Sequence, residues 1–258
     1  TSINTAALMM NTATPMRGDK KDLGSFFNKI VYSVSISDLI KAGYLSQVTG
    51  RRILTSFNLN SVHTHRGDFS TGELASAVNT KERNTFVVNK FKEHSISRKA
   101  IAFCADVQHC QDLAQVFNTE GIIAEAVWGD MDTNLRKQRL LSLSTGQIQV
   151  ITSCGLLTEG FDEPSIQAII MARPTRSKGL YIQMAGRGLR LHPEKQDCLV
   201  LDFTDQYHNL NSVINLQHVI AEATYVDEMP KVEKEKIDRT AKIKTLKDVD
   251  RKFDILGA

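Results

Sequence analysis

Two arginines, Arg187 and Arg190, lie three residues apart in the segment YIQMAGRGLRLHP, residues 181–193. If residues 178–191 form a helix, both arginines share one face with Gln183, because they follow it by four and seven positions. A guanidinium group is a planar fork of donors that suits the oxygens of a phosphate. The spacing therefore indicates a site for a phosphate-bearing ligand. The alternative is a pair of ordinary surface arginines on an amphipathic helix.

Two glycines, Gly186 and Gly188, stand beside these arginines. Each weakens a helix by about 1 kcal/mol relative to alanine. The close approach of another backbone or of a ligand is a physical reason to keep a glycine at such a position. On the opposite face of the helix, we expect Leu180, Met184 and Leu191 to pack on a sheet.

A second segment, VITSCGLLTEGFDEPSI (150–166), has similar chemistry. An apolar strand ends at Thr152 and Ser153, and hydroxyls with free backbone N–H groups at such a place can hold a phosphate. Asp162, between a glycine and a proline, is placed to accept a hydrogen bond from a sugar hydroxyl or an arginine. An ordinary turn is the alternative for this segment alone. The two segments in this order, separated by one strand, favour the phosphate site.

Five short apolar runs predict strands, and three amphipathic segments between them predict helices. The expected strands are 98–104, 122–128, 148–153, 166–172 and 197–203, and the expected helices are 106–120, 133–146 with Thr133 as its N-cap, and 178–191. This alternation indicates an α/β fold, a parallel sheet with helices on both faces. Sites in such sheets form at the carboxyl ends of strands. We therefore expect the chemistry in the loops after Cys104, Trp128, Ser153, Ala172 and Phe203.

The flanking regions are less regular. Residues 35–45 predict a short helix closed by a glycine, 46–60 an extended segment and 73–94 a helix. The charged stretch from about Asp227 onward is expected to be an exposed helix or a loose tail, with a docking or nucleic-acid-binding arm as the alternative.

Composition excludes few classes of protein. The 258 residues are 41% hydrophobic and 24% charged, which is typical of a folded globular protein, and the net charge of +3 is too small to argue for a polyanionic partner by itself. No apolar run approaches the ~20 residues that span a membrane. The four cysteines form no C-x-x-C pair and predict buried free thiols in a reducing compartment. The two histidines of VHTHRGDF (62–69) predict a solvated loop, and no metal site is expected.

Four segments resemble the motifs of superfamily-two helicases. QMAGRGLR (183–190) resembles motif VI, Q-x-x-G-R-x-x-R; motif V is similar to 151–166, motif IV to 99–114 and motif III to NTATPMRGDK, residues 11–20. The resemblance runs from about Met9 to Asp205. The chain looks like the branch with XPB-type and mitochondrial or phage DNA helicases, because Gln183 stands where DEAD-box RNA helicases have a histidine.

The resemblance implies roles for individual residues. Arg187 and Arg190 would be arginine fingers that reach the γ-phosphate of ATP, and Gln183 would orient the nucleotide or the attacking water. Gly160 and Asp162 would contact the nucleotide and position an arginine. The remaining implied roles are contacts to the nucleic-acid backbone by Thr152, Ser153 and Gly129, and coupling of hydrolysis to strand movement by Thr12, Ala13 and Thr14.

The resemblance also implies a division of the chain. Residues 1–45 would be the end of a first RecA-like lobe with a linker, 46–205 the second RecA-like lobe, and 206–258 a C-terminal extension. The sequence contains neither G-x-x-x-x-G-K-[ST] nor D-E-x-[HD]. ATP and Mg²⁺ are therefore expected to be held mainly by the first lobe of the same parent chain, and this chain is expected to be a piece that is inactive alone.

Two other functions stay open. A stand-alone RecA-like module could bind nucleic acid or protein without ATP, although retention of both arginines argues against it. A motor subunit of a restriction or remodelling system would use the same lobe to translocate without unwinding. For the helicase, the expected partner is nucleic acid, DNA rather than RNA, in an intracellular compartment: the cytoplasm, the nucleus or the mitochondrion.

Overall fold

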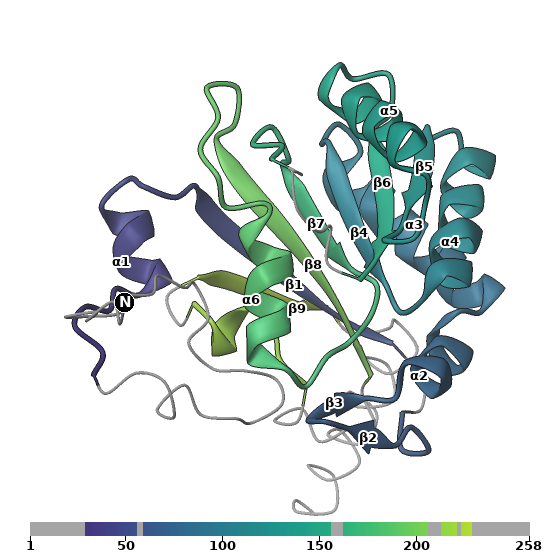
Figure 1. Ribbon diagram of the computed structural model, residues 1–258, viewed down its shortest axis with the longest axis horizontal. Coiled ribbons are helices and arrows are strands. Elements are labelled where there is room, and N and C mark those ends of the chain that lie inside the picture. Colours follow the sequence, from purple (N-terminus) through teal and green to yellow (C-terminus); the bar gives the residue numbers. More distant parts are fainter. Residues whose placement is uncertain (1–28, 56–58, 156–161, 206–212, 221–222, 229–258) are drawn as a thin grey trace, which may run out of the picture.

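The computed structural model describes residues 29–55, 59–155, 162–205, 213–220 and 223–228. Within these ranges, seven strands form one sheet in the order β5–β6–β4–β7–β8–β1–β9, and all neighbours run parallel (Figure 1). The strands are β1 (Gln47–Thr55), β4 (Ala100–Cys104), β5 (Ala124–Val127), β6 (Val150–Cys154), β7 (Ala168–Met171), β8 (Asp197–Asp205) and β9 (Thr224–Glu228). The predicted α/β class with a parallel sheet is confirmed.

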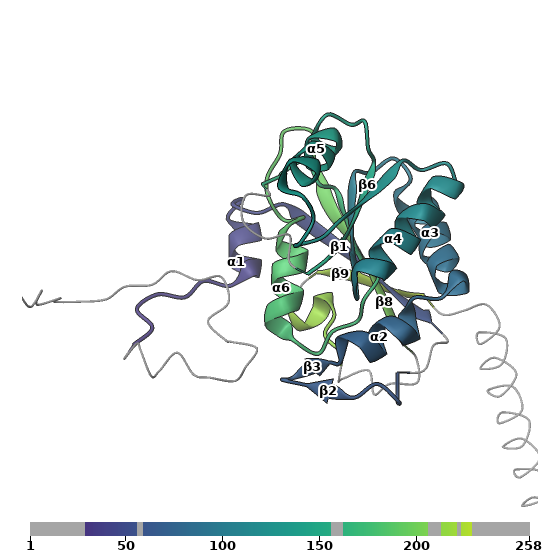
Figure 2. The same ribbon diagram turned by 45° about the vertical axis from the view of Figure 1, so that its right-hand side comes forward.

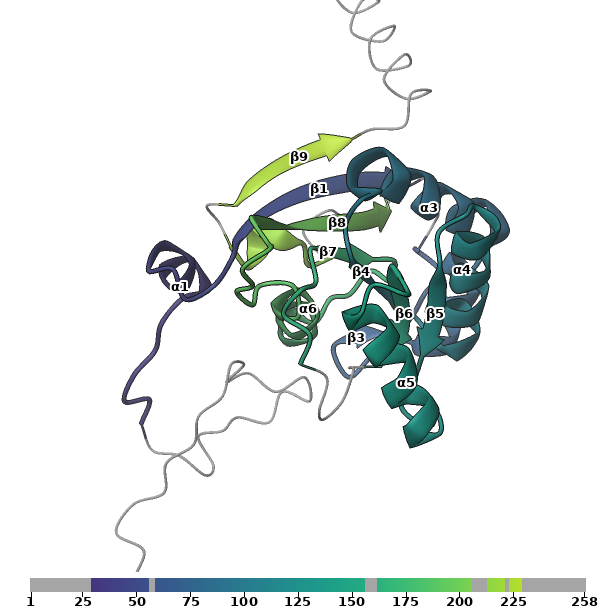
Figure 3. The same ribbon diagram turned by 90° about the horizontal axis from the view of Figure 1, so that it is seen from above.

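Helices cover both faces of the sheet (Figure 3). One face carries α3 (Lys81–Ser95) and α4 (Val107–Thr119), and the other carries α1 (Ile36–Lys41), α5 (Thr133–Ser144) and α6 (Lys178–Gly186). Polar side chains start these helices: Asp106 accepts from the third N–H of α4, and Ser177 does the same for α6. Gly121 and Gly146, both with positive φ, follow the ends of α4 and α5.

The strand β4 shows how the core is divided. All five of its residues are buried, as expected for a strand covered on both faces. Ile101 and Phe103 pack into the hydrophobic cluster under α5 and α6. Ala100, Ala102 and Cys104 pack into the cluster under α3 and α4. Small residues on this side let α4 lie close to the sheet.

A small subdomain lies between β1 and α3, at the edge where the strands end (Figure 2). It consists of an antiparallel hairpin, β2 (Thr64–His65) and β3 (Asp68–Phe69), followed by α2 (Thr71–Val78). A third hydrophobic cluster joins the hairpin and α2 to the main body through Phe69, Leu74, Ala105 and Val213. The hairpin is therefore packed on the body of the protein.

Three predicted elements need correction. The predicted helix 73–94 is two helices, because the chain leaves the helical conformation at Asn79 and Thr80, and Thr80 caps α3. The N-cap of α5 is Asp132 instead of Thr133, because the Asp132 carboxylate accepts hydrogen bonds from the backbone N–H groups of Asn134 and Leu135. The helix predicted over 178–191 ends at Gly186.

The packed body also extends beyond the predicted boundaries 46 and 205. β9 pairs with β1 at the edge of the sheet. Ile40 of α1 and Leu216 of the short 3-10 helix η2 (Leu216–His218) are buried in the cluster under α6. These parts of the predicted linker and extension therefore belong to the same folded unit. The predictions for residues 1–28 and 229–258 lie outside the described residues.

Candidate functional site

The arginine segment lies at the edge of the sheet where the strands begin, which we call the amino edge. α6 starts after the carboxyl end of β7 and crosses one face of the sheet to the opposite edge (Figure 1). At that edge, the carbonyl of Arg190 accepts hydrogen bonds of 2.8 Å from Ser46 Oγ, just before β1, and from Lys195 Nζ, just before β8. The prediction that the chemistry lies at the carboxyl ends is therefore wrong for these arginines.

The early end of α6 changes how the predicted residues are presented. Gln183 is exposed on the helix, Arg187 is its C-cap, and Arg190 follows in a non-helical segment. A shared helical face therefore does not bring Arg190 to its neighbours. Leu191, expected to pack on the sheet, has 54% of its surface exposed.

Arg190 forms an ion pair with Asp162, so the structure brings two of the predicted residues together. The Nη1–Oδ1 distance is 2.9 Å, and the side chains are 33% and 77% exposed. An exposed pair of this kind contributes at most about 1 kcal/mol to stability. The pair matters because it joins the segment before β7 to the segment after α6, although Asp162 and Arg190 are 28 positions apart in the sequence.

Arg187 adds a second positive charge at the same place. Burial, and then the like charge of Arg190, lower the pKa of the Arg187 guanidinium, while Asp162 opposes the shift. Arginine stays charged at any ordinary pH. Two guanidinium groups that repel each other beside one exposed carboxylate favour the binding of an anion.

Asp162 is held in place through its neighbour Glu163, which is buried. The Glu163 carboxylate accepts hydrogen bonds from the Ser144 hydroxyl, at the end of α5, and from the backbone N–H of Ser165 at 3.0 Å. Burial raises the pKa of Glu163, but these hydrogen bonds and the charge of Lys99 outweigh burial and lower it. Glu163 is therefore an ionised anchor at the amino edge.

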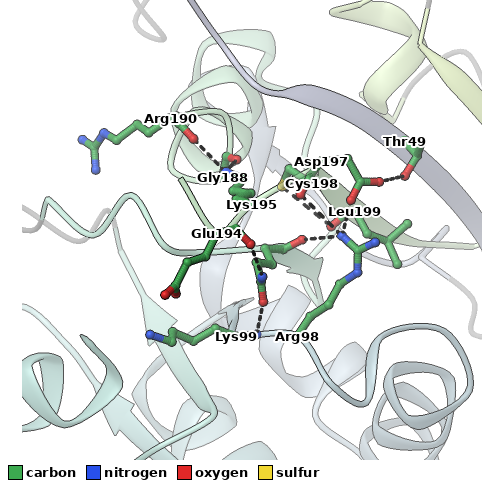
Figure 4. A network of polar contacts seen from close by, with 11 residues as sticks. Thr49, Arg98, Lys99, Gly188, Arg190, Glu194, Lys195, Asp197, Cys198 and Leu199 are labelled. Carbon is green, nitrogen blue, oxygen red and sulfur yellow. Dashed lines mark hydrogen bonds and ion pairs between the residues drawn. The ribbon is translucent and has the colours of Figure 1, made fainter. Parts of the chain in front are cut away.

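Gly188 and Lys195 fix the segment that carries Arg190 (Figure 4). A Cβ atom on Gly188 would lie 2.4 Å from Cys198 Sγ and 2.7 Å from Ile169 Cγ1, so the backbone sits directly on β7 and β8. The buried Lys195 ammonium donates to the carbonyls of Gly188 and Arg190. The predicted close approach is thus found at Gly188. At Gly186 a Cβ would meet nothing within 4 Å.

A polar network beneath Lys195 ties the starts of several strands together (Figure 4). Arg98 Nη1 donates to Asp197 Oδ1 at 2.7 Å and to the Gln167 carbonyl at 3.1 Å. Thr49 Oγ1 donates to the other oxygen of Asp197 at 3.3 Å. This network links β1, β4, β7 and β8 at the amino edge, so the arginine segment rests on a braced surface.

The residues predicted to contact nucleic acid lie at the opposite, carboxyl edge. Gly129 is exposed after β5, and its carbonyl accepts from Arg136. Ser153 is buried at the end of β6, and its hydroxyl has no hydrogen-bond partner among the described residues. Thr152 is fully buried, and its hydroxyl donates to the Cys110 carbonyl at 2.8 Å. The prediction of a backbone contact by the Thr152 side chain therefore needs correction, because this hydroxyl is used inside the fold.

The sequence did not point to Ser46, Lys195 or Asp197. Each stands a few residues before an apolar strand, and a single polar residue at such a position is ordinary in loops. Their roles depend on where β1 and β8 lie in the sheet, which a linear pattern does not give. The predicted residues Gly160, Thr12, Ala13 and Thr14 lie outside the described residues.

The described residues also bear on metal sites and membrane-spanning helices. They contain no group of three or more His, Cys, Asp or Glu side chains that could hold a metal ion. His63, from the two-histidine loop, contacts Glu73 at 3.0 Å. No helix in the described part of the chain has the length and hydropathy needed to cross a membrane.

Comparisons with known proteins identify the family. Residues 82–192 match the family described as helicase conserved C-terminal domain. A relative from Saccharomyces cerevisiae named ATP-dependent helicase IRC3 is 34% identical over 195 residues, covering 74% of this chain and 28% of the relative. One from Schizosaccharomyces pombe, named mitochondrial ATP-dependent helicase irc3, is 33% identical over 78% of this chain and 33% of its own length. This chain thus spans about a third of these relatives.

The fold is also similar to that of a solved structure, a fragment of the HsdR subunit of a type I restriction enzyme from Vibrio vulnificus. The TM-score is 0.64 at 20% identity, over 84% of this chain and 42% of that one. The matched family covers the segments before and after β7 that meet in the Arg190–Asp162 pair. The chain therefore contains the helicase conserved C-terminal domain of a superfamily-two helicase-like protein.

Proposed function

We propose that this chain is the second lobe of an ATP-dependent nucleic-acid helicase, and that its amino edge faces ATP held by a first lobe. The observation that carries the proposal is the grouping of Arg187, Arg190 and Asp162 on a braced surface. Arg190 leaves Asp162 for the γ-phosphate, and Arg187 supports it. Positive charge placed at a transferring phosphoryl group accelerates hydrolysis by roughly 10³–10⁵.

The residues present fit part of this task. Two guanidinium groups suit the phosphates of ATP, and bound ATP supplies the phosphoryl group that is transferred to water. Gln183, exposed one turn before Arg187, is placed to orient the nucleotide or the water. The described residues contain no group of three or more His, Cys, Asp or Glu side chains that could hold a metal ion, so we derive no step through Mg²⁺ on this chain. The first lobe would hold both ATP and Mg²⁺.

At the carboxyl edge we propose contacts to the nucleic-acid backbone through Ser153 and the loop at Gly129. The buried hydroxyl of Ser153 lacks a partner in the described part of the chain, which supports a ligand at the end of β6. Ser153, at the carboxyl edge, and Asp162, at the amino edge, are nine positions apart in the sequence. This short separation along the chain supports coupling between hydrolysis and movement along the strand. DNA is the expected substrate, and an intracellular, mitochondrial-type location is the expected setting.

The test is the ATPase activity of a protein that joins this chain to its first lobe. We expect Arg190→Ala to lower the nucleic-acid-stimulated kcat at least a hundredfold with little change in nucleic-acid affinity. Lys92→Ala, an exposed basic residue on α3, is the control and should keep full activity. An Arg190→Ala variant with normal kcat would sink the arginine-finger role.

Two further results would redirect the proposal. ATP turnover by the isolated 258-residue chain, lost in Arg190→Ala, would show that the first lobe is not needed. Full ATPase without strand separation, but with displacement of a third strand from a triplex, would identify a translocase of the restriction or remodelling kind. Binding of nucleic acid with no ATPase in any arrangement would favour the stand-alone module.

A further inference from the structure

The β2–β3 hairpin lies at the carboxyl edge of the sheet (Figure 2), and its turn contains a basic residue. Its two-residue turn is Arg66–Gly67, with φ of 51° and 87°. Such a turn requires positive φ at both positions and favours Asn-Gly or Asp-Gly. Arg66 is the sole non-glycine residue with positive φ in the described part of the chain. Arg66 is poorly suited to this turn, yet it places a positive charge at the hairpin tip, where its side chain is exposed.

Asp68 locks the hairpin onto the chain that leaves β7. Its Oδ2 accepts from Arg173 Nη2 at 3.0 Å and from Thr175 Oγ1 at 2.9 Å, and its Oδ1 accepts from the backbone N–H of Arg176 at 2.8 Å. Asp68 and Arg173 are both mostly buried, with 18% and 12% of their side chains exposed. The tip is therefore held at a fixed place relative to β7 and the start of α6.

The same contacts bring a second exposed arginine to the hairpin. The Arg176 guanidinium lies 6.0 Å from the centre of the Phe69 ring, over β3. Lys178, also exposed, begins α6, whose first turn contains no acidic residue. Among the described residues of this region, Asp68 is engaged by the contacts just described and Glu73 by His63. The exposed side chains of Arg66, Arg176 and Lys178 therefore make the described part of this face basic.

We infer that Arg66 and Arg176 form a contact for the phosphate backbone of a nucleic acid, on the same edge as Ser153. The inference rests on the proposed function, because it takes nucleic acid to be the ligand of this edge. Phosphate contacts of this kind hold a strand without reading its bases. The hairpin adds to the carboxyl edge beside the chain that leaves β7, to which Asp68 is bonded.

The experiment compares nucleic-acid binding by the unsubstituted chain with binding by a double variant that carries both Arg66→Asn and Arg176→Gln. Asparagine suits the turn, and glutamine keeps the backbone N–H that binds Asp68, so the variant should unfold at the same temperature or higher. Fluorescence anisotropy would follow labelled duplex DNA, single-stranded DNA and single-stranded RNA between about 50 and 200 mM salt. Loss of two phosphate contacts should lower the slope of log affinity against log salt by about two for a duplex. Lys92→Ala, which removes a charge at the far end of α3, should leave the slope unchanged.

The outcomes separate this inference from the proposed function. Wild-type affinity and slope in the double variant, with binding by the unsubstituted chain, overturn the hairpin contact alone. No binding by the unsubstituted chain to any of the three nucleic acids overturns both. A fall in slope on DNA but not on RNA, or the reverse, supports the contact and identifies the strand that it holds.

Discussion

The two edges of the sheet are built differently. At the amino edge, half-exposed cations lie on a surface braced by buried groups: Arg187 and Arg190 are supported by Lys195 and by the Arg98–Asp197 pair. At the carboxyl edge, several described polar groups under the loops are buried and hydrogen-bonded inside the fold. His109, for example, accepts the Ala105 N–H through Nδ1 and contacts Asn84 through Nε2.

The length of α6 explains why the arginines do not lie at the carboxyl ends of the strands, where ligand sites of parallel sheets are expected. Ligands of parallel sheets gather where strands end, and α6 does begin there. A helix of nine residues spans about 13 Å, however, which is the length of a short strand. A residue at its end therefore reaches the opposite edge. The motif that starts beside the carboxyl edge delivers its charges to the amino edge, so one domain can serve two ligands.

The largest expected effect comes from Gly188→Ala at the amino edge. The new methyl group would clash with Cys198 and Ile169, which are buried and cannot move freely. We expect a loss of about 3 kcal/mol in the free energy of unfolding, measured by urea denaturation. The displaced segment should also impair ATPase activity in the two-lobe protein. Gly186→Ala, with open space around its Cβ, is the matched control and should be neutral or stabilising. Equal effects of the two changes would contradict the packing argument.

A smaller effect, at the carboxyl edge, concerns pH. Burial, and then the charges of Arg83 and Arg173, lower the pKa of His109 to about 3 from 6.5. The folded protein thus keeps this ring neutral, while the unfolded chain binds a proton below pH 6.5. Stability from His109 is complete above that pH and is lost as the pH falls toward 3, by ~2 kcal/mol at pH 5.

Urea denaturation at pH 7.5 and 5 of the wild type and of His109→Asn would measure this loss. Asparagine keeps an acceptor for the Ala105 N–H but does not titrate, so the variant should lose ~2 kcal/mol less than the wild type between the two pH values. Identical pH dependence in both proteins would mean that His109 is not the titrating group. Arg190→Ala, at the amino edge, should leave the difference between the pH values unchanged.

A structural feature of this protein can be predicted from the sequence when the residues that determine it lie close together along the chain. The strands around Ile101 and Ile169 follow from continuous apolar runs, and α4 follows from the helical spacing of its apolar residues, because these are local signals. The pairing of Arg190 with Asp162 could be suggested only by reading two motifs together. The ammonium of Lys195 and the carboxylate of Asp68 gave no signal, since their partners are 5 to 108 positions away and are brought near by topology.

Thr152 gives the smallest and most discriminating test of the comparison. Its resemblance to a nucleic-acid-binding position conflicts with the hydrogen bond that its hydroxyl donates to the Cys110 carbonyl. Thr152→Val keeps the shape and removes the hydroxyl, leaving the Cys110 carbonyl without that donor, so we expect a loss of about 1 kcal/mol in unfolding free energy. Nucleic-acid affinity should not change. Ser153→Ala, next to it, should instead leave stability nearly unchanged, because its hydroxyl has no partner, and should weaken binding. The reverse pattern, with Thr152→Val weakening binding at unchanged stability, would mean that β6 opens to present Thr152 to the strand.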